Sequence, residues 1–241
     1  MLKVATGNMY RFITHLYNPV RGRCGYDCTY CYVKKMSHRF YFEQKPIHLV
    51  ESELKADIGK ENFIFVCSGC DLFHPDVPDE WIRQIMQHCS HFPNRYLWHT
   101  KNAHRLVGFA ESNYLPELST LCVTVESNYN HPISKAVPTF QRLTALMSKK
   151  ITQDKMITIE PVMKFEPAAF ADMILACNPV QVNIGADSGN NHLPEPCEDD
   201  IVSLVKLLEG YTTLYFKPNL KRLIPGYWGD LIKEKMGGID G

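Results

Sequence analysis

Short apolar segments rich in β-branched and aromatic residues recur along the 241-residue chain, separated by longer segments of mixed polarity. Segments of this kind, bounded by turn-forming residues, are typical of buried β-strands. The sequence therefore predicts strands at 63–69, 95–100, 121–127, 156–162, 180–188 and 212–217, after a first strand near 13–17.

Several intervening segments carry apolar residues at helical spacing, which predicts amphipathic helices at 79–89, 139–150, 168–177 and 198–210. Each begins with residues that favour a helix N-terminus. These are Asp79 after Pro78, Thr139 after Pro138, Pro167, and the acidic Glu198, Asp199 and Asp200.

The alternation of strands and helices predicts a parallel sheet with right-handed crossovers. About six βα units follow the first strand, fewer than a full (β/α)8 barrel contains. We therefore expect an α/β fold, a partial (β/α)6 TIM-like barrel. One domain is expected over residues 1–241, with a core at about 12–217 and a C-terminal extension at 218–241.

Composition narrows the class of protein. The chain is 45% hydrophobic and 22% charged, has no apolar run of about 18 residues, and begins MLKVATGNMYRF, without the apolar region of a secretory signal. We expect a cytoplasmic protein with no membrane partner.

The formal net charge is zero, which argues against a protein that coats nucleic acid nonspecifically. Basic residues nevertheless concentrate in residues 1–46, interleaved with aromatic ones. Cations bind phosphates and aromatic rings stack on bases, so a nucleic-acid or nucleotide partner is one interpretation, and a solvated cationic face is the other. The residues are Tyr10, Arg11, Arg21, Arg23, Tyr26, Tyr32, Lys34, Lys35, Arg39, Phe40 and Tyr41.

The segment RGRCGYDCTYCYVKK contains three closely spaced cysteines, Cys24, Cys28 and Cys31. Without a secretory signal they are more typical of metal ligands than of disulfides. A structural zinc site needs four ligands, and the nearest further candidates are His38 and the Cys67/Cys70 pair. Three thiolates can instead bind three irons of a [4Fe–4S] cluster and leave the fourth iron open.

Two interpretations of the three cysteines that involve no catalysis remain possible at this point. A zinc-stabilised DNA-binding module would use the triplet and one more ligand structurally. A redox-sensing iron–sulfur protein would need a protein ligand such as His38 on its fourth iron.

The CxxxCxxC triplet after the first predicted strand, with Tyr30 before its last cysteine, resembles the cluster loop of the radical S-adenosylmethionine (SAM) superfamily. Over nearly the whole chain, NPVRGRC, FVCSGCDLFHPDVPDEWI, HTKNAHRL, VTVES, ITIEP, IGADSG and YFKP resemble a phage-associated radical-SAM-like family. That family is known mainly as a domain of unknown function and is distantly related to spore photoproduct lyase. Where it usually has a Ser-Met-Ser-Asp-like sequence, this chain has Cys67-Ser-Gly-Cys70-Asp71.

The resemblance implies a [4Fe–4S] cluster on Cys24, Cys28 and Cys31, SAM as cosubstrate, and an electron donor of the flavodoxin or ferredoxin type. An electron from the cluster would cleave SAM to a 5′-deoxyadenosyl radical that abstracts a substrate hydrogen. Within such an enzyme, residues at the C-terminal ends of the strands are expected to bind SAM.

The cofactor-binding candidates divide by the part of SAM they would contact. Ser68, Gly69 and Asp71 suit the methionyl ammonium group, and Lys101 suits the methionyl carboxylate. Other candidates are Glu126 and Ser127 for the ribose, with the Gly185–Ala186 backbone and Tyr30 for adenine.

Three residues are catalytic candidates, each with a structural alternative. Cys70 is a hydrogen-atom donor to a product radical, or a core thiol like Cys67, Cys89, Cys122 and Cys177. His74 lies in a proline-bounded loop over the site, or serves as a hydrogen-bonded structural group. Glu160 is an acceptor for substrate or cofactor, or a structural ion-pair partner of Lys217.

The resemblance also suggests the substrate. A base in duplex DNA would have to leave the stack to meet a buried radical. Isomerisation of a modified thymine in phage DNA, in the cytoplasm of a host cell, is one hypothesis. Repair of a base photoproduct by a lyase is the alternative.

Overall fold

A computed structural model describes residues 2–7, 9–36, 45–229 and 231. Of the residues considered above, His38, Arg39, Phe40 and Tyr41 lie outside this part of the chain. The fold is α/β: one mixed, mainly parallel sheet with the strand order β1-β2-β5-β6-β7-β8-β9-β10, and a small two-stranded sheet of β3 and β4.

The strands of the main sheet are β1 (Lys3–Val4), β2 (His15–Tyr17), β5 (Phe63–Val66), β6 (Arg95–Thr100), β7 (Ser119–Thr124), β8 (Asp154–Ile159), β9 (Gln181–Ile184) and β10 (Thr213–Phe216). Those of the small sheet are β3 (Val20–Arg21) and β4 (His48–Leu49). The helices are α1 (Tyr32–Met36), α2 (Asp79–Ser90), α3 (Ala103–Glu111), α4 (Thr139–Leu146), α5 (Pro167–Leu175) and α6 (Glu198–Leu208), with 3₁₀ turns η2 (Glu51–Lys55) and η3 (Pro218–Arg222).

The predicted fold class is confirmed. β2 and β5 to β10 are parallel neighbours, and only β1 pairs antiparallel, with β2, among the described strands of this sheet. The expected helix starts also hold: Pro138 precedes α4, Pro167 opens α5, and the Glu166 carboxylate caps α5 by accepting from two backbone N–H groups. α3 is a further helix, in a segment for which no element was named.

Most predicted strands are too long at their C-terminal ends. The segment 63–69 forms a strand only to Val66, and 180–188 only to Ile184. The polar residues that follow leave the sheet and form loops.

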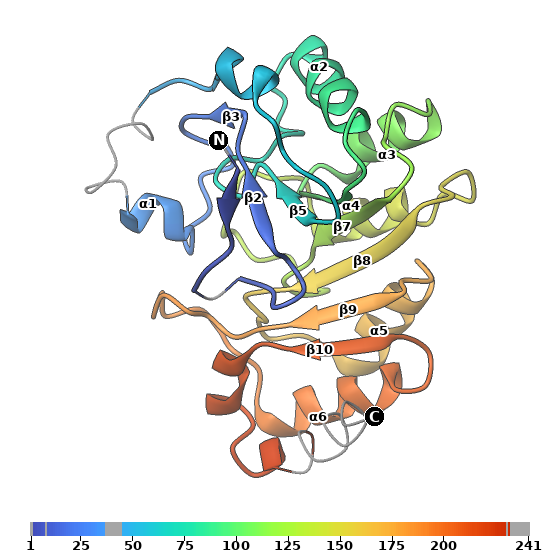
Figure 1. Cartoon of the computed structure of the whole chain (residues 1–241). Helices are drawn as coiled ribbons and strands as arrows, with labels where there is room; N and C mark the ends of the chain where they lie inside the picture. Colours follow the sequence, from blue (N-terminus) through green and yellow to red (C-terminus); the bar gives the residue numbers. More distant parts are fainter. Residues whose placement is uncertain (1, 8, 37–44, 230, 232–241) are drawn as a thin grey trace.

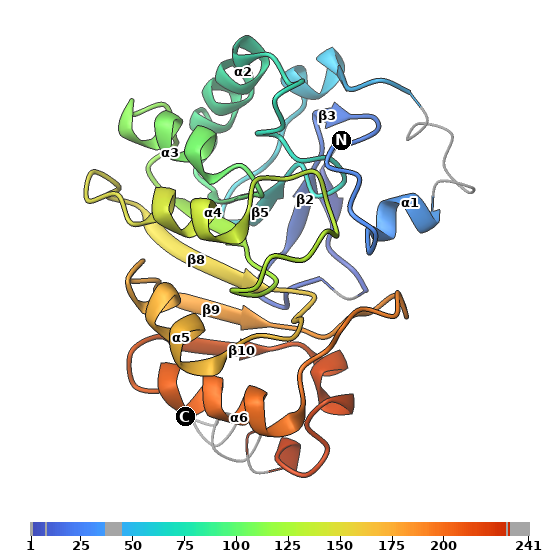
Figure 2. The same cartoon turned by 180° about the vertical axis from the view of Figure 1, so that it is seen from behind.

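The sheet has two apolar faces. One packs against the helices; Figure 2 shows α4 beside β8, and α5 and α6 in front of and below β9 and β10. It includes Ile64, Trp98, Val123 and Ile157. The alternate residues of the same strands form a second cluster, with Phe63, Phe65, Leu97, Cys122 and Met156, on the inner face of the partial barrel.

The N-terminal segment closes the lower end of this inner face. Tyr10 and Ile13 belong to the inner cluster, and the Tyr10 hydroxyl hydrogen-bonds to Thr158 Oγ1 at 2.9 Å. The backbone N–H of Arg11 donates to the Tyr215 hydroxyl of β10 at 3.0 Å. The prediction that Tyr10 belongs to a base-stacking surface is therefore wrong, because its ring is buried in the core.

Candidate functional site

The C-terminal ends of the parallel strands meet at one end of the sheet. In Figure 1 the arrowheads of β8 and β9 point toward the side where α1 lies, directly after the cysteine segment. Nearly all the candidate residues therefore lie at this end of the molecule, as expected for an α/β fold.

The cysteine loop, residues 22–31, is held by two neighbouring segments. Thr29 N donates to the Ile133 carbonyl at 2.9 Å, and Lys135 N donates to the Tyr26 carbonyl at 2.7 Å. Gly25 passes close to the His74 ring: a Cβ at residue 25 would lie 2.7 Å from two ring atoms. Only glycine allows this approach.

His74 therefore supports the cysteine loop directly. Its ring is buried, lies edge-on to Tyr26 at 4.5 Å, and accepts a hydrogen bond from Asp76 N through Nδ1. These contacts are those of a hydrogen-bonded structural group, and a catalytic role for His74 stays a prediction. The burial of Tyr26 also corrects its expected place on a stacking surface.

The three cysteines of the loop are each partly exposed. Burial raises the pKa of Cys28; Lys101 opposes the shift, and the charges of Glu126, Cys31 and Cys24 add to it. Within the described residues, no three His, Cys, Asp or Glu side chains converge on a point where one metal ion could bind.

The three thiols of the loop fit a [4Fe–4S] cluster. A single zinc ion draws all its ligands to one point, whereas each thiolate of a [4Fe–4S] cluster binds its own iron. Three partly exposed thiols on one loop suit the second case. His38, the proposed fourth ligand, lies outside the described residues.

Cys70 contacts the first cysteine of the triplet. The two thiols hydrogen-bond, which lowers the pKa of Cys24 to about 7 and raises that of Cys70. Cys70 is buried, with 3% of its surface exposed, so it is both a core thiol and a neighbour of a candidate ligand. Cys89, Cys122 and Cys177 are buried, as predicted.

The loop after β5 has an unusual backbone. Cys67 is buried as predicted, but it follows the strand and has a φ of +59°, a left-handed conformation that non-glycine residues rarely adopt. Asn18 Oδ1 accepts from Ser68 Oγ at 3.2 Å and from Gly69 N at 3.3 Å. The space beside Gly69 is open, as a ligand-binding loop requires.

Asp71, in contrast, is engaged by the protein itself. Its Oδ1 accepts from Phe73 N and from the Thr100 hydroxyl, and its Oδ2 accepts from Lys101 N at 2.8 Å. The carboxylate ties the end of β5 to the end of β6. A contact with the methionyl ammonium group stays a prediction.

Glu126, at the end of β7, lies at the centre of a buried network. Its carboxylate accepts a hydrogen bond from Tyr30, pairs with Arg142 Nη1 at 2.9 Å, and lies 3.7 Å from Lys101 Nζ. Burial acts to raise the pKa of Glu126, but Lys101, Arg142 and Tyr30 together hold it below its usual value. The structure thus brings together Tyr30, Lys101 and Glu126, three of the predicted residues.

The remaining cofactor candidates have structural partners. Ser127 Oγ donates to the Lys164 carbonyl at 2.6 Å and accepts from Tyr129 N. The Gly185 carbonyl accepts from Val162 N, and Ala186 is held by Asn219. Contacts of these residues with ribose or adenine stay predictions.

Glu160, at the end of β8, pairs with Lys217 Nζ at 2.8 Å, as the sequence suggested. The Lys217 ammonium also lies 4.6 Å from the centre of the Tyr10 ring. Burial raises the pKa of Glu160, and the attraction of Lys217 offsets only part of this shift. Gly185 gives the pair room, because a Cβ there would lie 3.1 Å from both side chains.

Two residues of the site were missed. Arg142, on α4, is one charge within an amphipathic pattern, and nothing in that pattern distinguishes it from a surface residue. His99, on β6, hydrogen-bonds to Thr124 Oγ1 at 2.6 Å. Burial and the charges of Lys101 and Lys217 lower its pKa to about 3, so it is neutral.

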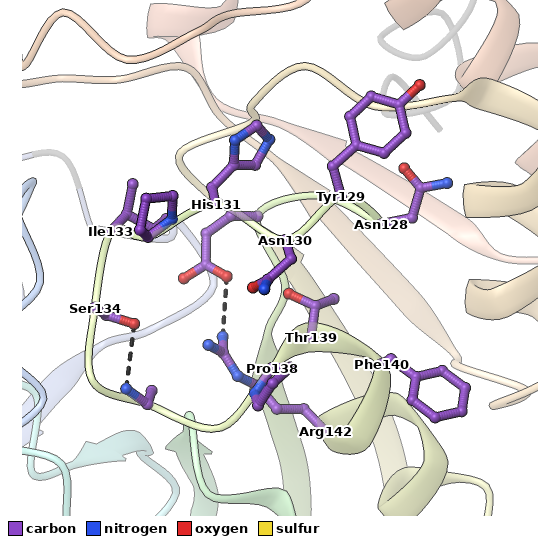
Figure 3. A pocket seen from close by; sticks show the side chains of 13 residues that line it. Asn128, Tyr129, Asn130, His131, Ile133, Ser134, Pro138, Thr139, Phe140 and Arg142 are labelled. Atoms are coloured by element: carbon purple, nitrogen blue, oxygen red, sulfur yellow. Dashed lines mark hydrogen bonds and ion pairs between the residues drawn. The ribbon is translucent and has the colours of Figure 1, made fainter.

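A cavity of about 140 Å³ lies beside the Glu126–Arg142 pair, on the side of α4. Figure 3 shows Asn130, Thr139 and Arg142 around it, beneath the loop that carries His131 and Ser134. The cysteines do not line it, so we do not assign the reaction to it.

The basic region is partly neutralised. Asp27 pairs with Arg23, Lys34 and Lys135, and Arg21 pairs with Glu53 at 2.7 Å. Lys35 donates to the Gly189 carbonyl, which links α1 to the loop after β9. Tyr32 is half exposed, and its hydroxyl donates to the Ser68 carbonyl at 3.1 Å.

Comparison with known proteins adds the family. Residues 8–195 match the model of a family described as "Protein of unknown function (DUF5131)". The chain belongs to this family. No curated protein matches it.

The fold is similar to that of spore photoproduct lyase. A cysteine-to-serine variant of that enzyme aligns with a TM-score of 0.63 and 10% identity, over 89% of this chain and 80% of the other. A variant with bound AdoMet and dinucleoside spore photoproduct aligns with a TM-score of 0.51 and 12% identity, over 92% and 63%. At this level of identity the similarity concerns the fold alone. It agrees with the partial barrel that the sequence predicted.

Proposed function

We propose that this chain is a radical SAM enzyme that acts on a nucleic-acid base or nucleotide. The observation that carries the proposal is the placement of Cys24, Cys28 and Cys31. They lie on one loop after the first parallel strand, at the C-terminal end of a sheet that resembles spore photoproduct lyase.

In this proposal Cys24, Cys28 and Cys31 hold a [4Fe–4S] cluster. When bound, the cluster supplies an electron that cleaves SAM to methionine and a 5′-deoxyadenosyl radical, which takes a hydrogen atom from the substrate. An electron donor of the flavodoxin or ferredoxin type provides that electron.

The chain's own residues orient and enclose this chemistry. Tyr30 and Glu126 fix the cysteine loop to the end of β7, and Lys101 presents a positive charge beside them. The open space beside Gly69 gives the SAM methionyl group room to approach. The inner cluster below keeps solvent from entering from beneath.

The substrate hypotheses rest on resemblance. Some of the similar spore photoproduct lyase structures contain a dinucleoside spore photoproduct, which favours a nucleic-acid substrate here. Isomerisation of a modified thymine in phage DNA and lyase-type repair are both compatible with the site. Cys70 as a hydrogen-atom donor belongs to the second. No described helix is long and apolar enough to cross a membrane, and a cytoplasmic location stays a prediction.

The test is anaerobic reconstitution with iron and sulfide, reduction, and addition of SAM. We expect 5′-deoxyadenosine from the wild-type protein and none from the Cys24→Ala/Cys28→Ala/Cys31→Ala variant. The matched control is Cys177→Ala, which removes a buried thiol far from the loop. A reconstituted protein that binds zinc, or a cluster that never cleaves SAM, contradicts the proposal.

A further inference from the structure

Four carboxylates follow the C-terminal ends of the parallel strands β5, β7, β8 and β9: Asp71, Glu126, Glu160 and Asp187. They differ in how many protein groups donate to them. Asp71 and Glu126 are each contacted by three donors, as described above. Asp187 accepts from Gly189 N, Asn191 N and Asn191 Nδ2.

Glu160 is the exception. Within the described part of the chain, its carboxylate has one hydrogen-bonding partner, Lys217 at 2.8 Å. An ionised carboxylate can accept about four hydrogen bonds. Since 18% of the Glu160 side chain is exposed, against 4% for Glu126, its unused acceptor capacity is accessible.

The position of Glu160 directs that capacity toward the barrel interior. Along β8, Met156 belongs to the inner cluster and Thr158 hydrogen-bonds to Tyr10, so the alternation of a strand places Glu160 on the same inner face. Lys217, opposite, lies above the Tyr10 ring. The pair is therefore just above the closed end of the barrel.

The surrounding charges define what the pair can bind. Lys101 and Lys217 both act on Glu160. Together with Glu160 and Glu126 these cations leave no net charge, so neither an ammonium group nor a phosphate gains a net attraction that offsets the cost of its desolvation. A neutral group with an N–H donor has a smaller cost of desolvation and satisfies the carboxylate.

We propose that Glu160, held in place by Lys217, is the residue that binds the reacting part of the substrate, and that this part is a nucleobase whose N–H edge donates to the carboxylate. Carboxylates accept from base N–H groups in this way elsewhere. The inference deepens the proposed function, on which its choice of substrate class rests.

The test measures binding of reconstituted protein to two fluorescent probes: a short single-stranded oligothymidylate and an abasic strand of equal length. The wild-type protein is expected to bind the oligothymidylate roughly tenfold more tightly, the worth of one charged hydrogen bond. The variant Glu160→Leu/Lys217→Met should lose this difference and bind both probes as the wild type binds the abasic strand.

The double substitution replaces a buried ion pair with apolar groups, a change that proteins often tolerate. Thermal unfolding checks that the variant is folded, and Glu160→Gln, which keeps the shape, provides a second variant with an intermediate loss. Glu117→Gln is the control, because Glu117 is exposed and precedes β7 at the opposite end of the sheet.

Equal binding of the two probes by the wild-type protein overturns the inference, as does a double variant that still distinguishes them. Equal binding would also leave a sugar hydroxyl as the better partner for Glu160. Failure of the proposed function is distinguishable, because it appears as absence of 5′-deoxyadenosine from the wild-type protein, whatever the probes show.

Discussion

Glu126 and Glu160 occupy corresponding positions on neighbouring strands, yet their surroundings differ. Glu126 is contacted by Tyr30, Lys101 and Arg142, and its pKa is lowered; among the described residues Glu160 is hydrogen-bonded by Lys217 only, and its pKa is raised. The number of donors decides between the two outcomes, because burial favours the neutral acid in both. With three donors, Glu126 stabilises the fold, and with fewer donors Glu160 keeps acceptor capacity for a ligand.

The largest expected effect on stability concerns the ion pair between Glu126 and Arg142. Arg142→Met removes one partner of a buried pair and should lower the free energy of unfolding by about 3 kcal/mol. Urea unfolding measures it. The control Arg83→Met breaks an exposed pair with Asp79 at 3.6 Å and removes the guanidinium from the Phe109 and Tyr114 rings, which together should cost about 1 kcal/mol or less.

A second variant distinguishes an effect of the Glu126 charge from an effect of side-chain packing. If Glu126 matters through its charge, Arg142→Met/Glu126→Leu should recover part of the lost stability, because no unpaired buried charge remains. A double variant no more stable than Arg142→Met shows that the network does not act as an ion pair.

A smaller effect is expected at the Glu160–Lys217 pair. Gly185→Ala adds a Cβ 3.1 Å from both side chains, which should cost about 1 kcal/mol and displace the pair. The matched control is Gly108→Ala within α3, where no atom lies within 4 Å and a gain of about 0.5 kcal/mol is expected. Two variants of equal stability would show that the pair moves without strain.

The smallest effect is a difference in pH dependence. Glu126, with a pKa below the usual 4.5, stabilises the fold above that pH, and this contribution is lost as the pH falls through its native pKa. Glu160, with a raised pKa, favours the fold at low pH, and this contribution is lost as the pH rises from 4.5 to its native pKa.

Urea unfolding at pH values on both sides of 4.5 compares the two. Glu126→Gln should flatten the loss of stability on the acid side, and Glu160→Gln should remove a loss above pH 4.5. Each change in slope is at most about 1.4 kcal/mol per pH unit. Slopes that change in the same direction would contradict the contrast between the two residues.

The sequence predicted the fold class well because strand and helix patterns are local, although it placed the C-terminal ends of most strands several residues too late. It did not predict which of the carboxylates at the strand ends is held by several protein donors. That depends on contacts between distant residues: Tyr30 and Glu126 are 96 positions apart, and Arg142 reaches Glu126 from a helix whose polarity looks ordinary. Asp71 likewise meets the Thr100 hydroxyl across the sheet.

The N-terminal segment that carries Tyr10 closes one end of the partial barrel. Strands that do not close into a ring would leave a channel open at both ends, but Tyr10, Phe12 and Ile13 fill the lower end. Anything that enters from the strand ends must leave the same way. A segment that precedes the first parallel strand therefore limits the depth of the space open to a substrate. Substitution of its side chains is expected to change the size of the ligand that fits.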